Sequence, residues 1–178
     1  MKKEEKYTID VLFSQDQIKE KIAGLALKIS CDFKGKDPLI IAVLKGSFVF
    51  CADLIRNLDP AFAVDFISLS SYSGSVSEGK IRVISNLKEN LEGRDVIIVE
   101  DIIDTGLTLD FLLNEFKKKE PKSITTCVLL DKKCARVKDV SVEYRCFEIN
   151  DDFVVGYGLD YSGFFRGLPY IGILKIEK

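Results

Sequence analysis

The sequence contains no histidine at any of its 178 positions. This absence excludes every mechanism in which histidine activates a serine or cysteine nucleophile. Acid–base chemistry must therefore fall to Asp, Glu, Lys or Tyr side chains. The five cysteines, at positions 31, 51, 127, 134 and 146, include no Cys-x-x-Cys pair, and a zinc site is not expected. Cys51 and Cys127 lie in apolar runs and are expected in the core.

Long apolar segments are also missing. No run approaches the ~18 apolar residues of a membrane helix, and residues 1–6 lack the apolar segment of a signal peptide. We therefore expect a protein of the reducing cytoplasm with no membrane partner. The net charge of −2 does not indicate a nucleic-acid surface. The one short basic run, Lys117 to Lys119, is better explained by the negative end of a helix dipole.

A cluster of polar residues follows the apolar run from Val96 to Val99. Its members are Glu100, Asp101, Asp104, Thr105, Gly106 and Thr108, and the apolar Leu107 lies between the last two. An apolar pattern with helical spacing begins at Leu109. The pattern predicts a buried parallel strand, a tight polar loop and a helix N-terminus. Ligands of α/β sheets bind at the carboxyl ends of strands, and a helix N-terminus offers N–H groups to a phosphate. The two adjacent carboxylates suit Mg²⁺. A plain helix N-cap is the alternative explanation for such residues.

A second unit of the same kind begins at Pro38. The run from Pro38 to Leu44 predicts a buried parallel strand. Lys45-Gly46-Ser47 follows, and a helix carrying Phe48, Cys51, Ala52 and Ile55 comes next, with Ser47 as its cap. The Lys and Gly could form an anion site or only an ordinary turn.

The remaining pattern completes an α/β chain. Ser14 to Gln17 resembles a capping box, and Ile18, Ile22, Leu25, Ala26 and Ile29 then share one helical face. Further strands are predicted at 64–69, 81–84, 123–130, 144–149 and 169–176. The small polar residues from Ser70 to Gly79 indicate either a mobile lid or a passive hairpin connection. No linker, repeat or low-complexity tract divides residues 1–178, so we expect one domain.

The string Glu-Asp-Ile-Ile-Asp-Thr-Gly-x-Thr from Glu100 closely resembles the phosphoribosyl-pyrophosphate (PRPP) motif of the 6-oxopurine phosphoribosyltransferases. Leu44-Lys45-Gly46-Ser47 resembles the pyrophosphate loop of that family, in which the Leu–Lys peptide is typically cis. Ser71-Tyr72 matches the Ser-Tyr pair of its lid. The segment from Val154 to Tyr161 resembles its Val-Val-Gly-Tyr-x-Leu-Asp-Tyr block. With Lys132, these five blocks run in family order from Leu44 to Arg166.

The resemblance implies a type I phosphoribosyltransferase fold. This is a twisted, mainly parallel sheet flanked by helices, with a small hood lobe formed from the N- and C-terminal segments. It implies Mg²⁺-dependent transfer of the 5-phosphoribosyl group from PRPP to hypoxanthine or guanine, which gives IMP or GMP and pyrophosphate, in a homodimer or homotetramer. Two alternatives stay open: a xanthine-preferring enzyme, and a nucleic-acid-binding regulator on the same fold.

The resemblance also implies roles for individual residues. Asp104 is predicted to be the general base that takes the proton from purine N7, although an N-cap is its competing role. The 5′-phosphate would be held from Thr105 to Thr108. The pyrophosphate would be held by Lys45, Gly46 and Arg166, the metal by Glu100, Asp101 and Asp160, and the purine by Lys132, Phe153, Val154 and Asp160. An ammonium has only donors, so Lys132 would favour a 6-oxo over a 6-amino purine.

Overall fold

The computed structural model describes residues 6–59, 61–71, 81–85 and 87–176. Its helices and strands are, in chain order, β1 (Tyr7–Phe13), α1 (Gln15–Asp32), β2 (Leu39–Leu44), α2 (Phe48–Asn57), β3 (Ala63–Ser71), β4 (Ile81–Ser85), β5 (Asp95–Ile103), α3 (Leu107–Lys117), β6 (Ser123–Asp131), the 3₁₀ turn η1 (Lys133–Ala135), β7 (Tyr144–Glu148), β8 (Val154–Val155) and β9 (Ile171–Ile176). The expected α/β class and all the expected strands are confirmed.

Two sheets organise these elements. The main sheet has the strand order β4-β3-β2-β5-β6-β7. Only β4 runs antiparallel to its neighbour, and the other neighbouring strands are parallel. The small sheet has the order β1-β9-β8 and is antiparallel. It therefore joins the first strand of the chain to the last two.

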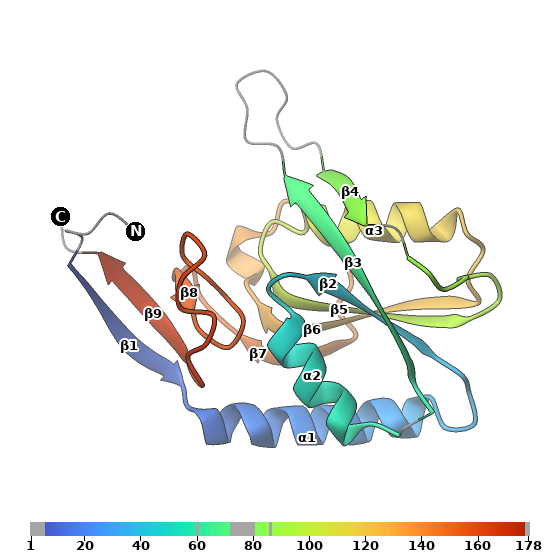
Figure 1. Cartoon of the computed structure of the whole chain (residues 1–178), viewed down its shortest axis with the longest axis horizontal. Helices are drawn as coiled ribbons and strands as arrows, with labels where there is room; N and C mark the ends of the chain where they lie inside the picture. The colour runs from blue at the N-terminus through green and yellow to red at the C-terminus, as the bar shows by residue number, and fades with distance from the viewer. Residues whose placement is uncertain (1–5, 60, 72–80, 86, 177–178) are drawn as a thin grey trace.

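The central strands are buried on both faces, as expected for a parallel sheet covered by helices. Successive residues of β2, β5 and β6 point to opposite sides. Ile40, Ile97 and Cys127 pack in the cluster beneath α1 and α2. Ile41, Ile98 and Val128 pack in the cluster beneath α3. Figure 1 shows the resulting three layers, with α1 and α2 on one face of the main sheet and α3 on the other.

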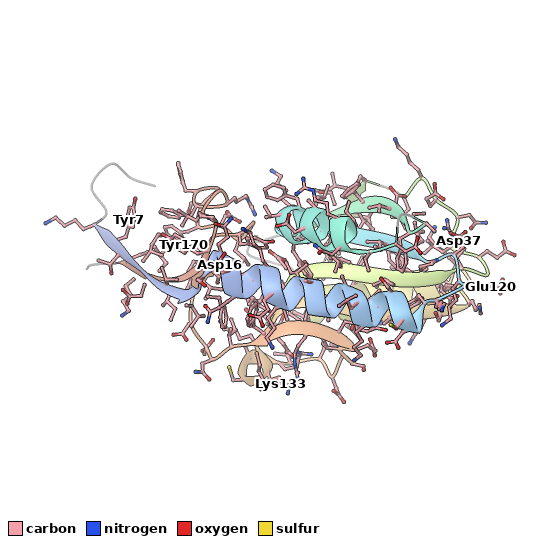
Figure 2. All side chains as sticks on the ribbon, turned by 90° about the horizontal axis from the view of Figure 1, so that it is seen from below. Tyr7, Asp16, Asp37, Glu120, Lys133 and Tyr170 are labelled. Atoms are coloured by element: carbon pink, nitrogen blue, oxygen red, sulfur yellow. The ribbon has the colours of Figure 1, made fainter. Side chains whose placement is uncertain are left out.

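The first helix forms as its sequence predicts. The Ser14 hydroxyl accepts from the Gln17 backbone N–H, and the Gln17 side chain accepts from the Ser14 backbone N–H, which completes the capping box. The buried residues of α1 are Ile18, Ile22, Leu25, Ala26 and Ile29. Figure 2 shows α1 extending from Asp16, near the small sheet, toward the opposite end of the molecule, where Asp37 and Glu120 lie.

The start of α2 differs from the prediction. Ser47 does not cap the helix with its side chain, because its hydroxyl instead donates to the carbonyl of Val43 at 2.6 Å. The buried residues of α2 are Phe50, Cys51 and Leu54, whereas Phe48 is exposed. The hydroxyl thus ties the loop after β2 back to its own strand.

The predicted strand before the polar cluster is also longer than the apolar run. Glu100 and Asp101 are strand residues of β5, because the ladder to β6 continues past them and ends where Ile103 pairs with Asp131. The polar loop therefore begins at Asp104 and not directly after Val99.

The small sheet lies beside the end of the main sheet at which β2, β5 and β6 finish (Figure 1). Ser71 is the last residue of β3, whereas the predicted lid residue Tyr72 lies outside the described residues. No helix in the described part of the chain is both long and apolar enough to cross a membrane.

Candidate active site

In the main sheet, the chain leaves two neighbouring parallel strands toward opposite faces of the sheet. Strands β2 and β5 pair side by side. Their following helices, α2 and α3, cover opposite faces of the sheet (Figure 1). The loops at the carboxyl ends of β2 and β5 therefore diverge and leave a crevice, which is the usual ligand position in open α/β sheets.

The loop after β5 surrounds a cavity at this point. The cavity has a volume of 250 Å³, and its lining includes most of the residues predicted for the phosphate and metal, namely Glu100, Asp101, Asp104, Thr105, Gly106 and Thr108. Gly106 is the N-cap of α3 and has a φ of +83°. A Cβ there would lie 2.9 Å from the Lys138 carbonyl oxygen, so both conformation and space favour glycine.

The loop after β2 lies against the carboxylate of Asp101. The Leu44–Lys45 peptide bond is cis, as the resemblance implies. A Cβ added to Gly46 would lie 1.6 Å from Asp101 Oδ2 and 2.4 Å from Asp101 Cγ. The absence of a side chain at Gly46 therefore allows the predicted pyrophosphate loop to approach the predicted metal ligand directly.

A third segment, from the C-terminal part of the chain, packs against the loop after β2. A Cβ on Gly158 would lie 2.2 Å from the Gly46 carbonyl oxygen. Arg166 donates from Nη1 to the Gly158 carbonyl at 2.6 Å and pairs through Nη2 with Asp160 at 2.5 Å. The structure thus brings together the three segments to which the sequence assigned pyrophosphate, phosphate and metal binding.

Tyr157 fixes this third segment to α2. It lies between Gly156 and Gly158, and all three residues have positive φ values. Its ring is buried and its hydroxyl donates to the carboxylate of Asp53 on α2. The hydrogen bond therefore links the C-terminal segment to the helix that follows the pyrophosphate loop.

The two adjacent carboxylates are electrostatically unfavourable in the absence of a cation. Glu100 is buried, and its Oε2 has no hydrogen-bond partner among the described residues. Burial raises the pKa of Glu100 well above its usual range, and the neighbouring Asp101 raises it further. Burial also raises the pKa of Asp101, whereas hydrogen bonding to Glu100 and the charge of Arg166 act in the opposite direction. The pair is therefore prepared to accept a positive charge.

Glu100 and Asp101 are suited to a Mg²⁺ ion whose remaining ligands come from the substrate. Within the described ranges, no group of three acidic or cysteine side chains is arranged to hold a metal ion alone, and Asp160 is paired with Arg166. Mg²⁺ is commonly bound by one or two carboxylates together with phosphate oxygens of a substrate. The unpartnered oxygen of Glu100 is available to such an ion.

We expect Glu100→Gln to raise the thermal unfolding temperature of the metal-free protein at neutral pH. Because the pKa of Glu100 is raised on folding, its contribution to stability is fully present below the unfolded value of ~4.3. That contribution is lost as pH rises through the folded value. The advantage of the variant should therefore grow from acidic to neutral pH in thermal melts recorded with EDTA. An equal or lower melting temperature at neutral pH would contradict this electrostatic account.

Of the predicted purine residues, Lys132 contacts the end of β5, directly before the phosphate loop (residues 104–108). The Lys132 backbone N–H donates to the Ile103 carbonyl at 2.9 Å, and the largely buried Lys132 ammonium pairs with Asp151 at 2.9 Å. Phe153 is 53% exposed, and its ring meets that of Tyr161 edge to face at 5.8 Å. Val154 is held in β8 by its pairing with β9. An exposed aromatic ring thus lies directly before a paired strand, where it could stack against a flat base.

Some residues around the site could not be found from local sequence pattern. Asp151 pairs with the predicted Lys132. Asp53 pairs with Tyr157, and Asp131 pairs with Arg136. Only Asp131 has a signal in the sequence, because it directly continues a buried strand. Its burial could have been inferred from that position, and a buried carboxylate needs a charged partner.

Comparison with known proteins places this arrangement among described families. The family model for the phosphoribosyl transferase domain matches residues 10–162. The chain is 43% identical over 168 residues to a hypoxanthine-guanine phosphoribosyltransferase of Streptococcus agalactiae, covering 94% of this chain and 93% of that protein. It is 45% identical over 166 residues to that of Bacillus subtilis, covering 93% and 92%. A crystal structure of a hypoxanthine-guanine phosphoribosyltransferase from Bacillus anthracis superimposes with a TM-score of 0.89 at 46% identity, covering 96% of this chain and all of that one.

Proposed function

The chain belongs to the hypoxanthine-guanine phosphoribosyltransferase family, and on that premise we propose how its three converging segments carry out the reaction. The enzyme transfers the 5-phosphoribosyl group of PRPP to hypoxanthine or guanine, gives IMP or GMP and pyrophosphate, and serves purine salvage. The observation that carries the proposal is the close approach of Gly46, Asp101 and Gly158 at the crevice between β2 and β5.

The N-terminus of α3 is proposed to hold the 5′-phosphate of PRPP. The backbone N–H groups from Gly106 to Thr108 begin the helix, and the hydroxyls of Thr105 and Thr108 line the same cavity. The positive end of the helix dipole and the N–H groups of its first turn favour an anion. The Leu107 N–H donates to Thr105 Oγ1 at 3.4 Å in the structure and would turn to the phosphate when it binds. Leu107 needs no polar side chain, since its role is carried by the backbone.

Lys45, Gly46 and Arg166 are proposed to receive the leaving pyrophosphate. Glu100 and Asp101 would hold one Mg²⁺, and Asp160 would help to hold a second. When bound, Mg²⁺ would supply positive charge to the pyrophosphate. As the C1′–O bond breaks, negative charge grows on the pyrophosphate and positive charge on the ribose. Cationic side chains at the leaving group and carboxylates near the ribose stabilise that separation of charge.

The purine is proposed to stack on Phe153. Lys132 would donate to its 6-oxygen, the backbone of Val154 would contact its edge, and Asp104 would accept the N7 proton. The buried position of Lys132 and the exposed ring of Phe153 support these roles. The small sheet would then act as the hood over the base within a single domain, with Ser71 and Tyr72 belonging to the lid. Assembly as a homodimer or homotetramer and a cytoplasmic location remain predictions.

The proposal is tested by product formation from PRPP and Mg²⁺ with hypoxanthine, guanine, xanthine and adenine supplied separately. We expect IMP and GMP to form and AMP to be absent, because the Lys132 ammonium cannot accept a hydrogen bond from a 6-amino group. EDTA should abolish product formation. If product formed only with xanthine, the proposed specificity for hypoxanthine and guanine would be wrong. If PRPP bound but no base gave product, the catalytic assignment would be wrong.

A further inference from the structure

A short segment, residues 133–138, contacts the phosphate loop and is not part of the lining of the cavity. The carbonyl of Thr105 accepts two hydrogen bonds, from the backbone N–H groups of Val137 and Lys138, each at 2.9 Å. The Lys138 carbonyl also lies 2.9 Å from the position that a Cβ on Gly106 would occupy. The segment thus contacts the two loop residues that precede α3 and restricts where their N–H groups can point.

Arg136 anchors this segment to the main sheet. Its guanidinium pairs through Nη2 with the carboxylate of Asp131 and donates through Nη1 to the Val140 carbonyl at 3.0 Å. Its side chain is 15% exposed, and a Cβ on Gly106 would lie 3.1 Å from its Cδ. The same side chain therefore holds its own segment and lies against the glycine of the phosphate loop.

Asp131 is itself held rigidly. It is the last residue of β6, where it pairs with Ile103 at the end of β5, and its side chain is 1% exposed. A second arginine, Arg145 on β7, also pairs with it at 2.8 Å. Because a guanidinium is a planar fork with fixed donor directions, pairing it with an immobile carboxylate fixes its orientation.

We propose that the Asp131–Arg136 pair is a positioning device for the 5′-phosphate loop, so that Arg136 determines affinity for the phosphate of PRPP without contacting it. The inference rests on the proposed assignment of residues 105–108 to the 5′-phosphate. Asp131, at the end of β6, holds Arg136, and Arg136 holds the segment that contains residues 137–138. These two residues in turn contact Thr105 and Gly106. Placement errors of ~1 Å in such groups can cost about 10²-fold.

Arg145 provides a matched control. It shares the carboxylate of Asp131, yet it is 38% exposed and its other partner is Glu148 on its own strand, at 3.5 Å. Arg136→Met and Arg145→Met therefore each remove one cation from the same carboxylate, and only the first removes the support of the loop. Arg136→Lys keeps the charge but loses the fork, and it should give an intermediate effect.

The experiment measures binding of GMP and of guanosine, which differ only in the 5′-phosphate, together with KM for PRPP and for guanine. For Arg136→Met we expect about a 10- to 100-fold loss of GMP affinity and a similar rise in KM for PRPP. Guanosine affinity and KM for guanine should change little. Arg145→Met should resemble the unsubstituted protein. Thermal melts of every variant verify that each one is folded.

The outcomes separate the inference from its premise. If the unsubstituted protein binds GMP and guanosine equally well, the assignment of the 5′-phosphate site itself is wrong. If it prefers GMP and Arg136→Met retains the same preference, the positioning role is overturned. Equal effects of Arg136→Met and Arg145→Met would also overturn it, since they would reflect only the charge balance around Asp131. Should Arg136→Met fail to fold, the same comparison of GMP with guanosine is made with Arg136→Lys.

Discussion

Asp104→Asn is expected to lower kcat by about 10²- to 10⁴-fold while leaving the affinity for PRPP nearly unchanged. Asp104 is an exposed residue at the first position of the phosphate loop, and it lines the cavity. Asparagine has nearly the same shape but cannot take the N7 proton of the purine. The backbone N–H groups that would bind the phosphate are untouched. Steady-state kinetics with saturating PRPP, together with a PRPP binding measurement, test both parts.

The competing role of Asp104, stabilisation of the N-terminus of α3, makes a different prediction. The structure assigns the N-cap position to Gly106, with no side-chain capping bond. Asp110→Asn removes an acidic side chain from the first turn of the same helix together with its 4.0 Å pairing to Lys138. It serves as the control for electrostatic effects on this helix, of which the dipole part is worth ~0.3–1 kcal/mol. If Asp104→Asn merely lowers the melting temperature as Asp110→Asn does, and turnover is retained, Asp104 is not the base.

Gly46→Ala is expected to reduce kcat/KM for PRPP by at least about 10²-fold. The added methyl group would overlap the Asp101 carboxylate, with only 1.6 Å to Oδ2. To avoid the methyl group, the Asp101 side chain would have to rotate away from its hydrogen bond with Glu100. Either the proposed pyrophosphate loop or this proposed metal-binding carboxylate must therefore move. Initial rates at varied PRPP and Mg²⁺ concentrations would show the loss.

Gly24→Ala is the matched control for this substitution. Gly24 lies within α1, and a Cβ there would meet no atom within 4 Å. Alanine is favoured over glycine in a helix by ~1 kcal/mol, so this variant should be fully active and at least as stable. Wild-type kcat/KM in Gly46→Ala would show that the close approach of Gly46 to Asp101 is not needed for the reaction.

The parts of the fold that local sequence pattern specifies were predictable. The capping residues Ser14 and Gln17 and the spacing of apolar residues determined α1, down to its five buried side chains. Continuous apolar runs indicated β2, β5 and β6, because a strand covered by helices on both faces must be apolar throughout. The resemblance, which rests on a long and specific string, gave a cis Leu–Lys peptide as typical of the family, but only the structure showed that the Leu44–Lys45 peptide is cis.

The parts that depend on pairing between distant segments were not predictable. Glu100 and Asp101 interrupt the apolar pattern, yet they remain in β5 because β6 supplies ladder partners past that point. Ser47 was expected to cap α2, but the Val43 carbonyl lies within reach of its hydroxyl. The contact of Asp53 with Tyr157 joins residues that no window of local sequence contains together.

The pairing of β1 with β9 has a consequence for the order in which the protein is completed during synthesis. Tyr7 pairs with Ile176, so the small sheet joins opposite ends of the chain. The entropic cost of closing a loop rises with its length, and contacts of such high sequence separation slow folding. Of the elements described, β9 is synthesised last. A nascent chain therefore contains both proposed anion-binding loops before it contains β9, whose Leu174 N–H donates to the Phe153 carbonyl, and the proposed base-binding segment gains this support only after β9 has been made.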